Sequence, residues 1–495
     1  MASPNVLLAQ ADDEEEELEF EFDATPTATE APITTARDAE LEALQRELAA
    51  LRARVEQLEV EEAEEEEAAP PAPAQASSFF GGAADSPTAS ARQPLAVSTR
   101  SRTFRASRGL KLSGYVQAQY ERHDDSEDQL YPGGLPMNQD RFLVRRGRVR
   151  LRGNWEYFAA EIELDGSTTS GINASVRRAN VSALLRSEDE NAPPLVALTA
   201  GLTEMPFGIE MQLGQEELVF MERSTGSLAL FPGPTDIGAV LNGGFGPLRY
   251  DLAVMNGTPI DDRAGTLLRE RNAAMDFFGR LGVEVGIGEV FEFVAGISFL
   301  KGKGFSPGQE ATENSLQWLD FNNDGVIQAT SEIIAVPGRA AIPSRNFNRW
   351  GVNGDIAFAI HTKRTGSTRV YGELAMGSNL DRGMFVSDPI LAGGNLRQVA
   401  GYAAILQDVT RYGIVGFRYD YYDPNADQLD TRLGRAVPAS ANIQTFSPVA
   451  GLRLPGRGRL LVQYDVVVDH LGRDAIGEPT DLRNNRLTVR LQGEF

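Results

Sequence analysis

From about residue 109 onward, apolar and polar side chains alternate with a period of two. In RVRLRGNW, Val149 and Leu151 alternate with Arg148, Arg150 and Arg152. Such alternation is typical of β-strands with one apolar and one polar face. The same pattern returns in KLSGYVQAQYE, FRYDYYDP, RLLVQYDVVVDH and the final LTVRLQGEF. We therefore predict an all-β body over residues 109–495.

The connections between the predicted strands alternate between short and long. Short turns fall at 153–157, 244–248, 286–289, 363–367 and 455–458. Long loops cover roughly 122–140, 204–236, 258–273, 305–347, 380–398, 423–444 and 470–483. This asymmetry is typical of outer-membrane barrels, which have short periplasmic turns and long extracellular loops. The count predicts a sixteen-stranded antiparallel transmembrane β-barrel that the strand ending at Phe495 closes.

Composition limits the alternatives. The chain has 495 residues, no Cys and a formal net charge of −23. It has no run of 18 apolar residues, so we expect no transmembrane helix. Residues 1–67 hold 22 acidic and 4 basic side chains, and the remainder holds 48 and 43. The acidity therefore belongs mainly to the N-terminal part, and nucleic acid is not an expected partner of either part.

The region before the barrel divides by composition. MASPNVLLAQA resembles the end of a signal peptide, so residues 1–11 are predicted to be its remnant, with cleavage after Ala11. Residues 12–36 form an acidic segment that we expect to be disordered. A coiled coil is predicted over 37–60 and a flexible linker over 61–108, which is rich in Ala, Pro, Gly and Ser.

The coiled-coil prediction rests on a 3-4-3-4-3 spacing of apolar residues. Glu47 with Arg52, and Arg54 with Glu59, would form pairs of opposite sign between parallel, in-register helices. The segment around Arg54 also resembles a motif of trimeric coiled coils, so we expect a homotrimer. A lone amphipathic helix is the alternative, since three heptads are marginal by themselves. The predicted seam consists of Leu41, Leu44, Leu48, Leu51, Val55 and Leu58.

Several segments resemble the phosphate-selective porin O and P family. They are FLVRRGRVRLRG, GLTEMPFGIE, FMERS, DIG and MNG, in that order between residues 142 and 257, and the resemblance as a whole runs over residues 110 to 495. The resemblance implies a trimeric porin with sixteen strands in the outer membrane of a Gram-negative bacterium, whose N-terminal region is periplasmic. It also implies that loop 204–236 folds inward as the constriction. The constriction residues it implies are Glu204, Phe207, Glu222, Arg223 and Asp236.

Two positions depart from that family. It usually has a basic residue before PFG, where this chain has Glu204-Met205. It usually has Arg shortly before the IG of the next strand, where this chain has Thr235-Asp236. Two positions expected to attract anions are therefore neutral or acidic.

Alternation also predicts which charged residues line the lumen. Arg148, Arg150 and Arg152 would form a ladder for anions, spaced about 7 Å apart by strand geometry. Alternatively, they pair with the acidic strand AEIELD, which follows after one short turn, and merely stiffen the wall. The predicted pore-lining set is Lys111, Arg148, Arg150, Arg152, Glu161, Glu163, Arg280, Arg369 and Arg490.

A metal motif lies in the long loop 305–347. LDFNNDGVIQATSE matches the first eight positions of a calcium loop, although its twelfth position is Ser331 and Glu332 comes one residue late. A plain Asn/Gly turn is the alternative. No cofactor is required by this interpretation, but a structural Ca²⁺ is predicted. Its ligands would be Asp320, Asn322, Asp324, Val326 and Gln328.

The sequence shows no catalytic constellation, nucleophile elbow or phosphate-binding loop. We therefore expect a porin, not an enzyme, through which small hydrophilic solutes diffuse passively, with anion or phosphate preference as the finer expectation. The alternative is an outer-membrane anchor whose coiled coil tethers the envelope to peptidoglycan or to a periplasmic partner. The expected partners are copies of the same chain, outer-membrane lipid and the small solutes.

Overall fold

A computed structural model describes most of the chain from residue 109 onward. The described ranges are 109–124, 140–169, 172–186, 193–257, 272–287, 290–362, 366–410, 412–432, 435–438, 441–455, 457–473, 479–482 and 484–495. The predicted signal-peptide remnant, acidic segment, coiled coil and linker, all within residues 1–108, lie outside these ranges.

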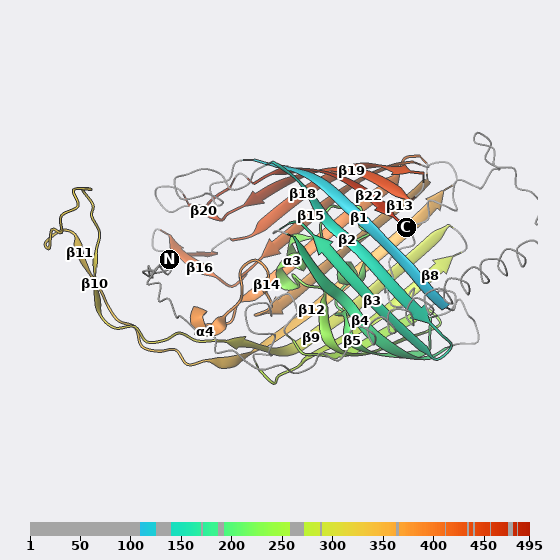
Figure 1. Cartoon of the computed structure of the whole chain (residues 1–495), viewed down its shortest axis with the longest axis horizontal. Helices are drawn as coiled ribbons and strands as arrows, with labels where there is room; N and C mark the ends of the chain where they lie inside the picture. The colour runs from blue at the N-terminus through green and yellow to red at the C-terminus, as the bar shows by residue number, and fades with distance from the viewer. Residues whose placement is uncertain are drawn as a thin grey trace, which may run out of the picture. The chain divides into compact units, whose positions relative to one another are not determined.

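The body is a closed antiparallel barrel, which confirms the predicted fold class (Figure 1). Each strand pairs with its neighbours in chain order, and the first strand pairs with the last. The sixteen barrel strands are β1 (Gly109–His123), β2 (Arg141–Asn154), β3 (Phe158–Ser167), β4 (Asn173–Leu185), β5 (Val196–Glu204), β6 (Thr235–Phe245), β7 (Leu248–Met255), β8 (Asp276–Ile287), β9 (Phe291–Ser306), β12 (Arg345–Thr362), β13 (Gly366–Ser378), β14 (Arg397–Asp408), β15 (Gly413–Asp423), β18 (Ile443–Leu454), β19 (Gly458–Asp469) and β22 (Arg486–Glu494).

The strands close because the predicted alternation fits the pleat. On β1, Tyr115 and Gln117 are buried inside the barrel, while Leu112 and Val116 are exposed outside. Closure pairs every strand on both sides, so the sheet has no free edge. β22 occupies the place predicted for it, between β19 and β1, and Phe495 N donates to Gly114 O.

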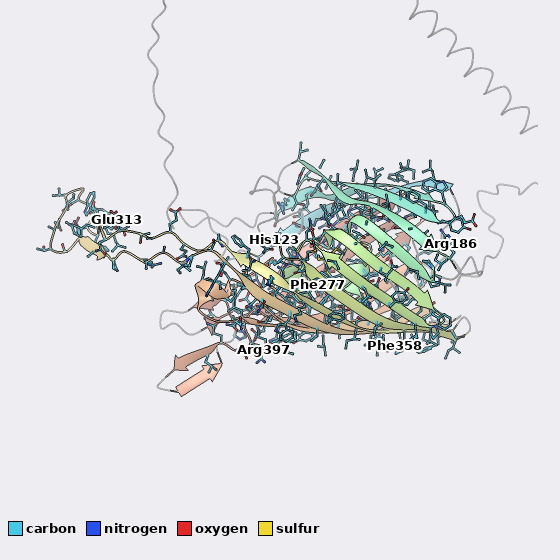
Figure 2. All side chains as sticks on the ribbon, turned by 90° about the horizontal axis from the view of Figure 1, so that it is seen from below. His123, Arg186, Phe277, Glu313, Phe358 and Arg397 are labelled. Carbon is cyan, nitrogen blue, oxygen red and sulfur yellow. The ribbon has the colours of Figure 1, made fainter. Side chains whose placement is uncertain are left out.

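The two ends of the barrel differ as the connection pattern predicted. The short turns after β2, β6, β8, β12 and β18 lie at one end. Two further connections at that end, 186–195 and 409–412, were missing from the prediction, and 168–172 is a short connection at the opposite end. In Figure 2, Arg186 lies at the turn end, whereas His123 and Arg397 lie at the long-loop end.

The long loop between β9 and β12 forms an arm that projects from the barrel (Figure 1). Its two sides are joined by bridges between Gln309 and Ile342 and between Thr312 and Arg339. Beyond these, β10 (Ser315–Trp318) pairs with β11 (Ile333–Val336), strands that the sequence did not predict. Other long-end loops hold β16 (Leu429–Arg432), β17 (Arg435–Pro438), β20 (Gly472–Arg473), β21 (Pro479–Thr480) and α4 (Pro389–Ala392).

The outer surface of the barrel is apolar. Figure 2 shows the outward side chains, with Phe277 and Phe358 among those it labels. The exposed apolar residues of the strands include Leu112, Val116, Val149, Leu151, Ile162, Leu164, Val181, Leu198, Leu252, Phe277, Leu281, Ile297, Phe299, Val352, Ile356, Ile405, Val415, Phe417, Val462 and Leu491. A surface of this kind far exceeds the apolar patches of water-soluble monomers and suits hydrocarbon.

Exposed aromatic residues mark the turn end of this surface. They occur on the turn between β2 and β3, at the end of β6, and after β14, and include Trp155, Tyr157, Phe158, Phe245 and Tyr412. Aromatic side chains at the edge of an apolar band are typical of a membrane–water interface. Among the described residues, no helix has the length and apolar composition needed to cross a membrane.

Candidate functional site: the inner segment and the barrel wall

Residues 205–234, which we call the inner segment, join β5 to β6 and run inside the barrel. They contain the short helices η1 (Glu210–Gln212) and α3 (Thr225–Leu230), and Figure 1 shows α3 within the ring of strands. From Met205 to Ser224 every side chain is buried except those of Glu216 and Glu217, which are partly buried. The inward course of this loop, which the family resemblance implied, is therefore what the structure has.

Apolar contacts attach the inner segment to one part of the wall. Phe207 and Phe231 pack together with ring centroids 5.0 Å apart, and the cluster around them includes Phe278 of β8 and Leu300 of β9. Val219, Phe220 and Met221 belong to a second cluster with Tyr402, Leu406, Ile414, Val449 and Leu461 of β14–β19. Ile209, Leu213 and Leu218 belong to a third, with Val294 of β9 and Ala357 and Ala359 of β12. The wall residues of the three clusters lie on strands from β6 to β19, and we call them the apolar half-wall.

The opposite part of the wall meets the inner segment through polar groups. Among the described residues, none from β1–β5 or β22 belongs to the three clusters that contain the inner segment. We call the inward faces of β1–β4 and β22 the charged half-wall. Its buried polar residues include Gln117, Gln119, Glu121, Arg146, Arg148, Asn154, Glu161, Glu163, Arg178, Ser182, Thr488, Arg490 and Gln492.

The arginine series of β2 is paired with acids of the neighbouring strand. Arg148 Nη1 lies 3.3 Å from Glu163 Oε1, and Arg148 Nη2 lies 3.0 Å from Asp165 Oδ2. Arg152 Nη2 lies 3.1 Å from Glu161 Oε2. Arg150 Nε binds Glu163 and lies 3.3 Å from Glu161 Oε1. Arg150 Nη1 lies 3.2 Å from Oε1 of Glu216, a residue of the inner segment. The structure therefore has the paired wall that was the alternative to a free anion ladder.

The remaining predicted pore-lining residues have different surroundings. Arg280 binds both carboxylate oxygens of Asp355, with Nη2 lying 2.8 Å from Oδ1. Arg369 Nη2 lies 3.3 Å from Asp408 Oδ1. Arg490 has no exposed surface and donates to Gln119 Oε1 at 2.6 and 2.8 Å. Lys111, by contrast, is exposed at the turn end, where β1 begins.

Three guanidinium groups surround Glu222. Arg145 Nε lies 2.7 Å from Glu222 Oε1, Arg146 Nη2 lies 2.8 Å from Oε2, and Arg490 Nη2 lies 3.4 Å from Oε1. Burial by itself would raise the pKa of Glu222, but Arg146, Arg145 and Arg490 hold that pKa well below its usual range. The cluster carries more positive than negative charge, because one carboxylate faces three cations.

A β-bulge explains why adjacent arginines share one carboxylate. Along β1, Gln117 pairs with Arg146 but Ala118 pairs with Val144, so Arg145 is an extra residue on β2. A bulge re-aims the side chain of the extra residue. Strict alternation places Arg146 in the lumen with Arg148, although the predicted pore-lining set did not include it, and places Arg145 on the outer face, so only the position of Arg145 depends on the bulge. The signal was the run VRRGR, in which two arginines interrupt the alternation.

The other predicted constriction residues lie on the inner segment or at its two ends, and each has its own contacts. Arg223 Nε donates to Glu210 O at 3.1 Å, and its Nη2 donates to Leu213 O at 3.2 Å. Glu204 binds Arg178 of the charged half-wall. Asp236 accepts hydrogen bonds from Ile237 N and Gly257 N, both at 2.7 Å. Phe207 is part of the apolar contact described above.

The calcium-like loop lies at the tip of the arm, where its side chains bind one another. Asp320 accepts from Asp324 N at 3.2 Å and Gly325 N at 2.8 Å, and Asp324 accepts from Gln328 Nε2 at 2.6 Å. Glu332 accepts from Gln328 N at 3.0 Å and Trp318 Nε1 at 3.3 Å. In the described part of the chain, no three His, Cys, Asp or Glu side chains gather to hold a metal. Calcium binding therefore stays a prediction. Of the predicted ligands, only Asp320 and Asp324 would supply carboxylates.

Comparisons with known proteins give structural likeness only. No family model matches the chain, and no curated protein matches it. Among solved structures, the outer membrane channel DcaP of Acinetobacter baumannii aligns with a TM-score of 0.47 and 10% identity, over 78% of this chain and 97% of that one. An anion-selective porin from Comamonas acidovorans aligns with a TM-score of 0.44 and 12% identity, over 78% and 99%. At these values the likeness carries no argument about activity.

Proposed function

We propose that this protein is an outer-membrane porin through which small hydrophilic solutes diffuse passively. One observation carries the proposal: a closed barrel has an apolar outer face and a charged interior, and an inward-folded segment narrows that interior. Such a barrel leaves no backbone group unpaired in lipid. Selection in such a pore comes from its width and its charged groups, without a chemical step. The short-turn end would face the periplasm.

We propose that any anion preference comes from the cluster around Glu222 and not from the arginine series of β2. Arg148 and Arg152 are neutralised by acids of β3, whereas Arg145, Arg146 and Arg490 share one carboxylate. Buried charges are screened little by salt, so this surplus would act on ions nearby. Phosphate preference and a homotrimeric assembly, which the family resemblance implied, are further parts of the proposal.

The test is the reversal potential of purified protein in a planar bilayer under a KCl gradient. We expect a shift toward the chloride potential in the wild type, which Arg146→Gln reduces and Arg152→Gln leaves nearly unchanged. A potential near zero or toward potassium would contradict the anion preference. Complete absence of conductance, with a correctly folded barrel, would contradict the porin function itself.

An anchor is the second candidate, and one observation favours it. Inward residues such as Gln117, Glu163 and Arg490 have no exposed surface, so the lumen is more filled than an open channel requires. In this case the predicted coiled coil would tether the envelope to peptidoglycan or to a periplasmic partner. Deleting residues 12–100 separates the two candidates. Envelope defects with unchanged conductance would support the tether, whereas unchanged envelopes would leave the pore as the sole role.

A further inference from the structure

The inner segment contacts the two halves of the barrel wall in different ways. On the apolar half-wall it packs through three hydrophobic clusters, and moving it there would expose Phe207, Phe220, Phe231 and their partners to water. Exposure of large buried aromatic side chains to water is strongly unfavourable, so the segment stays docked on this side. On the charged half-wall the contacts are hydrogen bonds and ion pairs, which water replaces at small net cost. Separation is therefore easiest along the charged half-wall.

Four residues of the inner segment, Gly214–Glu217, cross to that wall. Leu213 and Leu218, on either side, belong to the cluster with β9 and β12. Between them, the turn is closed by Glu217 N, which donates to Gly214 O at 2.9 Å. β9 and β12 are the ninth and tenth strands of the barrel, whereas the turn contacts the first, second and sixteenth. The turn therefore lies between the two sides of the lumen, and long side chains of the charged half-wall reach it.

Three long side chains of the wall hold the turn in place. Arg150 Nη1 lies 3.2 Å from Glu216 Oε1. Gln117 Nε2 donates to Gln215 O at 3.3 Å, and Gln492 Nε2 donates to Glu216 O at 3.1 Å. None of these contacts is apolar. Glu216 and Glu217 are also the residues of Met205–Ser224 that keep some exposure.

A cavity of about 120 Å³ lies beside this turn on the charged half-wall. Its lining joins the middle of the lumen to the turn end of the barrel, because Arg150 and Glu216 lie at one side and Lys111 and Arg457 at the other. Basic and acidic side chains are nearly balanced around it. Its charged lining residues are Lys111, Arg148, Arg150, Glu163, Glu216, Arg457 and Glu494.

We propose that solutes cross the lumen along the charged half-wall, through this cavity, and that Gly214–Glu217 is a lid that shuts the route in the present structure. The proposal rests on the porin function and adds a path and a closing element to it. The lid opens when Glu216 leaves Arg150, while Leu213 and Leu218 stay docked and serve as the fixed ends of the motion. Because the lining of this cavity is nearly balanced in charge, any anion preference of the route comes from the cluster around Glu222 and not from the cavity.

The first test compares single-channel records of the wild type with Glu216→Gln, a variant that keeps the size of the side chain but removes its charge. We expect a several-fold rise in open probability, and a larger rise when Gln492→Ala is added. Glu313→Gln, the same charge change on the exposed arm, is the control and should leave the record unchanged. Equal open probability in the wild type and both lid variants would overturn the lid.

The second test locates the route and exploits the absence of cysteine from the chain. Ser113→Cys places a thiol on the lining of the cavity, and a negatively charged methanethiosulfonate reagent should then remove more than half of the current. Ser447→Cys is the matched control, because Ser447 is fully buried on β18. Block at position 447, or no block at 113, would overturn the route. Absence of current in every variant would instead contradict the porin function.

Discussion

Arg145 Nε lies 2.7 Å from Glu222 Oε1, joining the barrel wall to the inner segment through a residue that a bulge turns inward. Arg146 and Arg490 complete the same cluster. Replacing Glu222 by Gln would leave three guanidinium groups around a neutral amide. We expect the free energy of unfolding to fall by on the order of 3 kcal/mol, since a buried ion pair is broken on one side.

The same variant should also change selectivity. The reversal potential of Glu222→Gln is expected closer to the chloride value than that of the wild type, because negative charge is lost beside the path. Denaturant unfolding of the detergent-solubilised barrel and bilayer recordings measure the two effects on one preparation. An unchanged potential together with unchanged stability would contradict the role of this cluster.

Acid should release the inner segment only at low pH. Glu222 lies outside the strands, and its pKa in the folded protein is well below its usual range, which is about 4.3 for an unfolded chain. A lowered pKa means that the ionised form stabilises the folded state above pH 4.3, and that this stabilisation is lost as pH falls through the folded value. We expect limited proteolysis of the inner segment to be constant from pH 8 to about 5 and to rise below about 4. Glu222→Gln should lose most of that dependence.

Truncating an apolar contact of the inner segment should loosen it without a change of charge. Phe220 is 1% exposed, packs in the cluster with Tyr402 and Leu461, and lies under the guanidinium of Arg418, 4.9 Å from its ring centroid. We expect Phe220→Ala to lower the free energy of unfolding by about 3–5 kcal/mol. Single-channel noise should increase because the segment is less firmly docked. Phe417→Ala, on the outer face of β15, is the control for the loss of an aromatic ring.

The tip of the arm gives a separate prediction about calcium. Asp320 and Asp324 are the two carboxylates of the calcium-like loop, and the indole Nε1 of Trp318, two residues before Asp320, donates to Glu332. We propose that Ca²⁺ binds here weakly, with a dissociation constant in the range of about 10⁻⁴ to 10⁻³ M that is typical of extracellular sites. A saturable change in tryptophan fluorescence on Ca²⁺ titration should appear in the wild type and vanish in Asp320→Ala. A linear, unsaturated response would leave the loop as an Asn/Gly turn.

The sequence predicted the strands well because alternation records the geometry of the pleat directly. Val149 and Leu151 face outward and Arg148 and Arg150 face inward, as their order requires. The loop lengths likewise predicted which end carries the turns. Both signals are local, so a single sequence is enough to find them.

The inner arrangement was harder to predict because it depends on contacts between residues far apart in sequence. Alternation showed that Glu163 and Arg150 share the lumen, but not that each would be paired. Leu300 and Leu461 lie at inward positions where polar residues are expected, and this was the available signal of an apolar half-wall. The position of Arg145 was unpredictable without its partner strand, since a bulge is defined by register.

The seam between β1 and β22 has a consequence for how the molecule is made. Gln117 pairs with Gln492 across a sequence separation of 375 residues, and the chain between them forms the other fourteen strands. Until β22 is available, the outer edges of β1 and β19 carry unpaired amides that invite association with other chains. Closure therefore depends on the last strand of the barrel, and we expect removal of β22 to yield aggregate instead of a smaller barrel.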